Sequence, residues 1–131
     1  MTSDRGQDAF AEQGWVRKFK VAFRGIGVGV RDQKSFRVHL PTGVAVLSLS
    51  AWLGIEVWQW CVLIGCIGLV LTLELLNTAL ESLSRAITRE HNEWIRDALD
   101  LASGAVLIGS LTSLAVGGLV LGPEIAKRFF G

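Results

Sequence analysis

Three polar side chains interrupt the most apolar stretch of the chain, and they share one helical face. Residues 69–81 read LVLTLELLNTALE, with no proline or glycine that would end a helix. At 100° per residue, Glu74 and Glu81 lie about 20° apart around this helix, and Asn77 lies about 60° from Glu74. A charge inside a bilayer costs about 2.5–3.5 kcal/mol, so this face requires a partner, a cavity or a chemical role.

The residue types on this face suit phosphoryl transfer. Glu74 lies deepest in the apolar stretch and has no basic residue three or four positions away. A carboxyl group in apolar surroundings accepts a proton more readily than one in water, as a general base must. Hard cations such as Mg²⁺ bind oxygen ligands and share them with substrate phosphates, so acidic side chains at a membrane edge could hold a metal nucleotide beside a lipid hydroxyl. The same residue types would also serve a proton or ion pathway.

Further acidic and basic residues follow where the next helix is expected to begin. Asp97 and Asp100 are three positions apart, so they are neighbours on its first turn, where the helix dipole favours a carboxylate. N-terminal capping is therefore an alternative role for one of them. Arg85 follows Glu81 by one turn in the order that favours an ion pair, which is the structural alternative for Glu81.

The composition and the order of apolar segments predict an all-α membrane protein with a single domain. The chain has 131 residues, half of them hydrophobic, with a mean hydropathy of +0.44. Its net charge of +1 predicts no nucleic-acid partner. We expect a disordered N-terminus at 1–9, an amphipathic surface helix at 10–31, and membrane spans at 37–55, 57–87 and 97–121.

Local signals support these segments. Pro41 suits the first turn of a helix, and Pro123 is expected to end the last span. Three tryptophans gather at the expected first turn, as in an interfacial aromatic belt: Trp52, Trp58 and Trp60. Small residues recur every four positions in the last span, which predicts close helix packing: Ala105, Gly109, Ser113 and Gly117.

The basic residues predict an orientation. Eight of the 13 lie at or before Arg37, and the first turn between spans has none. The positive-inside rule then places the N-terminus and the second loop in the cytoplasm, and the C-terminus outside. The polar face of residues 74–81 would lie at the cytoplasmic edge of the membrane.

These motifs resemble a known family. The segment from Glu74 to Glu81, ELLNTALE, followed by DLASGAVL from Asp100, is similar to the signature of the small prokaryotic integral-membrane diacylglycerol kinase/undecaprenol kinase family. The segments Arg24–Ile26 and Ser35–His39 match its N-terminal pattern, and the resemblance covers residues 15–122.

The resemblance implies a homotrimer in the bacterial inner membrane, with one surface helix and three transmembrane helices per subunit. It implies Mg²⁺- and ATP-dependent phosphorylation of the hydroxyl of a membrane lipid, diacylglycerol or undecaprenol, at the cytoplasmic interface. By motif position, Glu74 would be the catalytic base, Asn77 a polar partner in the active site, Glu81 a Mg²⁺ ligand and Asp100 a nucleotide-binding residue.

Three positions depart from the family pattern. Gln33 replaces a metal-binding glutamate, Arg85 replaces an acidic residue, and Leu99 replaces a lysine. Arg85 would restore positive charge for the nucleotide, since guanidinium binds phosphate well. The departures keep open an alternative, a catalytically degenerate member that binds lipid.

A transporter built around Glu74 would need polar residues in the outer halves of the spans, which instead read VLI at 62–64 and SLAV at 113–116.

Overall fold

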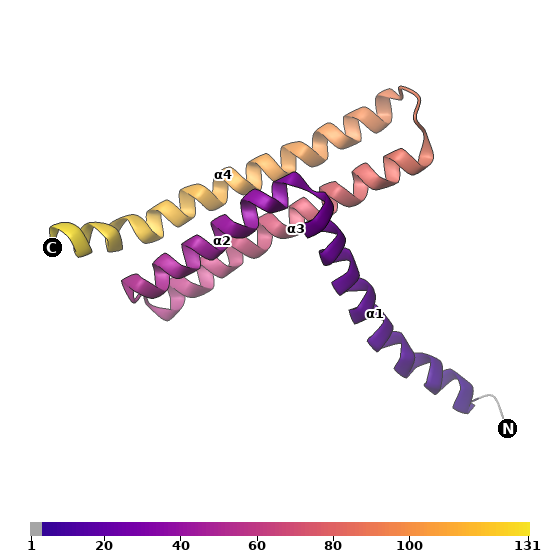
Figure 1. The fold of residues 1–131 in the computed structure, drawn as a ribbon, viewed down its shortest axis with the longest axis horizontal. Helices are drawn as coiled ribbons and strands as arrows, with labels where there is room; N and C mark the ends of the chain where they lie inside the picture. The colour runs from indigo at the N-terminus through magenta and orange to yellow at the C-terminus, as the bar shows by residue number, and fades with distance from the viewer. Residues whose placement is uncertain (1–3) are drawn as a thin grey trace. The chain divides into compact units, whose positions relative to one another are not determined.

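The protein is all-helical throughout the part of the chain that the structure describes. The structure is a computed structural model that describes residues 4–131, with side chains from residue 14 onward. The chain forms two compact units, Met1–Gln33 and Lys34–Gly131. Its helices, shown in Figure 1, are α1 (Asp4–Asp32), α2 (Lys34–Leu53), α3 (Val57–Ile87) and α4 (Glu93–Phe130).

The first unit consists of α1, in which basic residues alternate with exposed apolar ones. Trp15, Phe19 and Phe23 are each more than half exposed, and the Lys18 ammonium lies 4.7 Å from the centre of the Trp15 ring. The helix begins at Asp4, earlier than the expected residue 10. Of the segment expected to be disordered, residues 1–3 lie outside the described residues. The second unit begins at Lys34, so the single residue Gln33 lies between it and the end of α1.

Proline does not begin α2. This helix starts at Lys34, so Pro41 lies inside it, and the expectation of a first-turn proline is wrong. The upstream residues already form helical turns, and a proline removes one backbone donor without removing the rest of the helix. The hydroxyl of Thr42 donates to the carbonyl of Val38 at 2.7 Å, and Ser50 donates in the same way to Val46.

A tight turn joins α2 to α3 at the expected place. Gly54 has φ +67°, a left-handed conformation that glycine adopts without strain. Glu56 is the N-cap of α3, and its backbone N–H donates to Gln59 Oε1 at 2.8 Å in a capping box. The indole of Trp58 donates to Glu56 Oε2 at 2.8 Å. From this cap α3 runs without interruption to Ile87, the bounds expected from the sequence.

The last helix continues past the proline that was expected to end it. α4 runs through Pro123 to Phe130 because the residues beyond the proline have partners of their own. Ile125 packs against the core cluster of Ile55, Leu63 and Leu121, and Glu124 accepts a hydrogen bond from Gln59. Gly122 and Pro123 are therefore an interior feature of α4, not its end.

Within the second unit, α4 packs along α3, and α2 packs against both (Figure 1). Small residues set these approaches. A Cβ atom at Gly43 of α2 would lie 3.3 Å from Ile67 Cγ2, and one at Gly109 of α4 would overlap Leu73 Cδ1. The hydroxyl of Ser113 donates to the carbonyl of Cys66 at 3.3 Å. The small residues of the last span thus pack against α3, as their spacing predicted.

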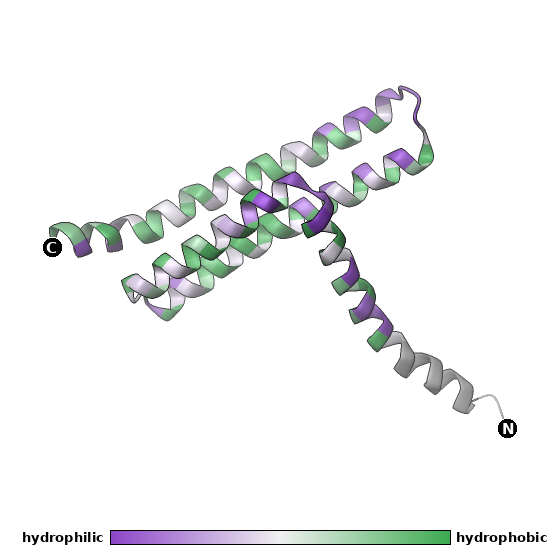
Figure 2. Cartoon of the chain, in the orientation of Figure 1, coloured by the Kyte–Doolittle hydropathy of each residue, from purple (hydrophilic) through white to green (hydrophobic). Residues whose placement is uncertain are grey.

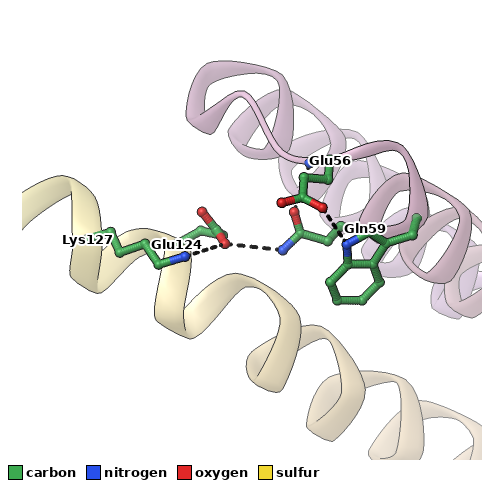
Figure 3. Close-up of polar contacts among 5 residues, drawn as sticks. Glu56, Gln59, Glu124 and Lys127 are labelled. Carbon is green, nitrogen blue, oxygen red and sulfur yellow. Dashed lines mark hydrogen bonds and ion pairs between the residues drawn. The ribbon is translucent and has the colours of Figure 1, made fainter.

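A polar network ties α3 to α4 beside the α2–α3 turn (Figure 3). Gln59 is only 4% exposed, and its Nε2 donates to Glu124 Oε1 at 3.3 Å. Lys127 Nζ donates to the same oxygen at 3.2 Å. One buried amide therefore serves both the cap of α3 and the far end of α4.

The helices expose large apolar surfaces. By length and composition, α3 and α4 could each cross a membrane, and α2 does not meet the same criteria. Figure 2 shows hydrophobic residues along the middle of both helices, with hydrophilic ones near the loop that joins them. Leu114 and Leu119 of α4 are 74% and 78% exposed within one chain. A face of this kind requires lipid or another protein surface to cover it.

Candidate active site

Glu74 is buried where α2 begins to cover α3. Its residue surface is 4% exposed, although both neighbours along the chain are leucines. The hydroxyl of Thr78 donates to the backbone carbonyl of Glu74 at 2.8 Å. No residue of α3, a helix that the structure describes in full, donates to the carboxyl group of Glu74. A buried carboxyl group of this kind requires a partner from another element.

That partner is His39 of α2. Its Nδ1 atom lies 3.0 Å from Glu74 Oε1, and both side chains are largely buried, with exposed fractions of 28% and 5%. The two atoms are close, but an N–H on Nδ1 would not point at Oε1. Nδ1 therefore makes no hydrogen bond in this arrangement. Sequence reasoning did not give His39 a role. The available signal was the position of this histidine, a side chain that can donate and accept protons, directly before a long apolar stretch.

Asn77, Glu81 and Arg85 form a ladder along α3 at four-residue intervals. Asn77 Nδ2 donates to Glu81 Oε1 at 3.2 Å, and Arg85 Nη2 lies 3.8 Å from Glu81 Oε2. The ion pair named as the structural alternative for Glu81 is present, but its distance and the exposed arginine make it a weak one. Asn77 Oδ1 is buried and has no hydrogen-bond donor. Glu81 therefore presents a carboxylate beside an unused amide oxygen.

The two aspartates of α4 are not part of this arrangement within one chain. Asp97 and Asp100 are both exposed, and Asp97 forms an ion pair with the adjacent Arg96 at 3.3 Å. No hydrogen bond or ion pair in the described part of the chain joins Asp100 to the polar face of α3. The alternative capping role is also wrong, because Asn92 is the N-cap and its side chain accepts from Ile95 N at 3.2 Å.

The departures from the family pattern lie in different surroundings. Gln33 occupies the single position between α1 and α2, and the adjacent Asp32 is held by Arg31 through contacts of 2.7 and 3.1 Å. Leu99 is half-buried on the first part of α4. Arg85 is exposed, so its guanidinium has free surface beside the Glu81 carboxylate.

The donor set fits a hard cation that shares its ligands with a phosphate. Among the side chains that the structure describes, residues 14–131, no three His, Cys, Asp or Glu side chains converge on one point. Glu81 and the unpartnered amide oxygen of Asn77 still supply two adjacent oxygen donors of the type that Mg²⁺ binds. Magnesium commonly keeps waters and nucleotide oxygens as its other ligands, so two protein donors are compatible with it.

Comparison with known proteins agrees with the motif. The family model described as prokaryotic diacylglycerol kinase matches residues 20–121, within the stretch that the resemblance covered. The chain is 38% identical over 108 residues to a diacylglycerol kinase of Synechocystis, covering 82% of this chain and 62% of that protein. The alignment thus spans less than two thirds of the Synechocystis protein.

Two further relatives are matched over most of their length. An undecaprenol kinase of Bacillus subtilis is 32% identical over 111 residues, covering 85% of this chain and 90% of that protein. A diacylglycerol kinase of Escherichia coli is 31% identical over 107 residues, covering 77% of this chain and 85% of that protein. The chain belongs to the prokaryotic diacylglycerol kinase family, a family of lipid kinases.

Proposed function

We propose that this protein transfers the γ-phosphoryl group of ATP to the hydroxyl of a membrane lipid, diacylglycerol, at the cytoplasmic face of the bacterial inner membrane. Undecaprenol is the alternative acceptor, since one relative is named for it. The observation that carries the proposal is the shared face of α3, where a buried carboxyl group stands one turn from the Asn77–Glu81 pair. The family match favours an active kinase over a degenerate member.

Glu74 is proposed to act as the catalytic base. The lipid oxygen forms a bond to the γ-phosphorus while the bond from that phosphorus to the β–γ bridging oxygen breaks, which releases ADP. The proton of the lipid hydroxyl passes to a carboxyl oxygen of Glu74. Positioning and charge stabilisation supply most of the catalysis in such transfers, so the rigid placement of this carboxyl group matters more than its basicity.

The Asn77–Glu81 pair is proposed to hold the nucleotide. Glu81 would bind Mg²⁺, with the unpartnered Oδ1 of Asn77 beside it. Bound Mg²⁺ would neutralise phosphate charge during the transfer. Asp100 and Arg85 would contact the nucleotide, the arginine through phosphate oxygens.

Assembly and orientation complete the proposal. We infer a homotrimer with α1 on the membrane surface, three spans per subunit, the N-terminus in the cytoplasm and the C-terminus outside. The exposed apolar side chains of α4 support burial against lipid or other copies. Because Asp100 is exposed and unconnected to Glu81 within one chain, assembly would also supply the remaining contacts around the nucleotide.

The test is phosphate transfer from radiolabelled ATP in mixed micelles, with diacylglycerol and undecaprenol offered separately. Glu74→Gln should abolish transfer to the preferred lipid while the protein remains folded. Glu56→Gln is the matched control, since that carboxylate caps α3 at its opposite end. Transfer by Glu74→Gln at the wild-type rate would show that Glu74 is not the catalytic base. The absence of transfer by the folded wild-type protein would favour a lipid-binding role.

A further inference from the structure

Glu74 has one polar partner from outside its own helix in the described part of the chain, and that partner is His39. Nδ1 of the ring lies 3.0 Å from Oε1 of the carboxyl group. This nitrogen is buried and makes no aligned hydrogen bond. Buried ring nitrogens in folded proteins find a partner, and the carboxyl group is the polar group within reach.

The distance implies that the pair holds a proton. An unprotonated ring nitrogen and a carboxylate oxygen are both acceptors, and two acceptors repel each other at 3.0 Å. A proton between Nδ1 and Oε1 turns that repulsion into a charge-assisted hydrogen bond. The second torsion of histidine is soft, so a modest ring rotation aligns the N–H with Oε1. Oε2 then remains the free acceptor of Glu74.

The packing of α2 against α3 brings the two residues together. Gly43 lies one turn after His39 on α2, and Ile67 lies two turns before Glu74 on α3, so each pair shares a helical face. A Cβ atom at Gly43 would stand 3.3 Å from Ile67 Cγ2, which shows how closely the helices approach there. The close packing of α2 against α3 therefore fixes the position of the His39 imidazole relative to the Glu74 carboxyl group.

We propose that His39 is a positioning residue for phosphoryl transfer, holding Oε1 of Glu74 so that Oε2 faces the lipid hydroxyl. The proposal rests on the role of Glu74 given under the proposed function. His39 does not itself touch the reacting atoms, and its contribution lies in fixing which carboxyl oxygen accepts the proton. Loss of that orientation would slow the chemical step and leave nucleotide binding unchanged.

The kinetic test compares two substitutions at position 39. His39→Leu should lower kcat about 100-fold with an unchanged KM for ATP, a loss typical of a disturbed general base. His39→Asn should recover most of that loss, because its amide nitrogen is attached to Cγ as Nδ1 is. Thr42→Val is the matched control on α2, since its hydroxyl serves only the carbonyl of Val38. An unchanged kcat in His39→Leu, or equal losses in both variants, would overturn the proposal.

A spectroscopic test does not depend on turnover. The chain has two histidines, so ¹⁵N-histidine labelling in micelles gives two sets of ring signals, of which His39→Asn removes one. Glu74→Gln should shift the Nδ1 signal of His39 and leave that of His91 in place. An unshifted His39 signal would overturn the pairing, even for a variant whose activity is lost.

The outcomes separate the two proposals. Full activity in Glu74→Gln would overturn the proposal that Glu74 is the base, whatever the activities of the His39 variants. An inactive Glu74→Gln together with a fully active His39→Leu would keep the base and remove the positioning role. A merely structural contact predicts that His39→Leu lowers the thermal unfolding midpoint while the kcat of the folded fraction stays at the wild-type value, which would also remove that role.

Discussion

Gly109 of α4 lies against Leu73 of α3 so closely that a Cβ atom at Gly109 would overlap Leu73 Cδ1. Leu73 directly precedes Glu74, so this contact sets how near α4 passes to the buried carboxyl group. On the other flank, the approach of Gly43 to Ile67 sets the position of α2. Two glycines therefore hold both neighbouring helices close to the part of α3 that carries the proposed base.

Gly109→Ala should lower the free energy of unfolding by about 1–3 kcal/mol, because the added methyl group overpacks the α3–α4 contact. Alanine favours a helix over glycine by about 1 kcal/mol, so Gly118→Ala, which meets nothing within 4 Å, should be neutral or stabilising. Thermal unfolding of both variants in detergent micelles measures the difference. Equal stabilisation by both substitutions would contradict the close approach.

Glu81→Gln should raise the Mg²⁺ concentration needed for half-maximal activity, because it removes the carboxylate beside the Asn77 amide oxygen. The glutamine keeps the side-chain size and an oxygen that Asn77 Nδ2 can reach. Mg²⁺ titrations of kinase activity measure the effect, with Glu56→Gln as a distant carboxylate control. A variant that loses thermal stability but keeps the wild-type Mg²⁺ dependence would assign Glu81 to the ion pair alone.

Arg85→Ala should change the free energy of unfolding by less than about 1 kcal/mol, since exposed ion pairs contribute little. The distance of 3.8 Å between Arg85 Nη2 and Glu81 Oε2 agrees with a weak pair. If Arg85 binds phosphate, the same change raises the KM for ATP, and Arg85→Lys restores part of it. An unchanged KM for ATP would leave Arg85 with the ion pair only.

The free energy of unfolding should decrease at acidic pH, because Glu124 becomes protonated there. Hydrogen bonds from Lys127 and then Gln59 lower the pKa of Glu124 from its ordinary value of 4.5, and burial opposes this only in part. A lowered pKa in the folded protein contributes stability above pH 4.5 that disappears as the pH falls through the folded value. Thermal unfolding between pH 7 and pH 3 should show wild type converging on Glu124→Gln in acid. A constant gap between the two would contradict this link between α3 and α4.

The bounds of α3 were predictable because an uninterrupted apolar stretch ends in a polar loop. The two prolines do not mark helix ends, because the residues around each of them are themselves held in a helix. Pro41 follows residues that are already helical, and Pro123 precedes Ile125 and Glu124, which have partners in the core and on Gln59. The N-cap of α4 is Asn92, which lies before both aspartates, because its side chain reaches the backbone N–H of Ile95.

The sequence alone determined the polar face of α3. Helical periodicity places Asn77 beside Glu81, and their hydrogen bond confirms it, because residues four apart on one helix have a fixed relation. Motif spacing likewise indicated the kinase family. The packing of the helices, in contrast, determines that His39 meets Glu74 and that Asp100 stays apart from it within one chain. The distance between helices depends on side-chain packing, here at Gly43 and Gly109, and no periodicity along the chain specifies it.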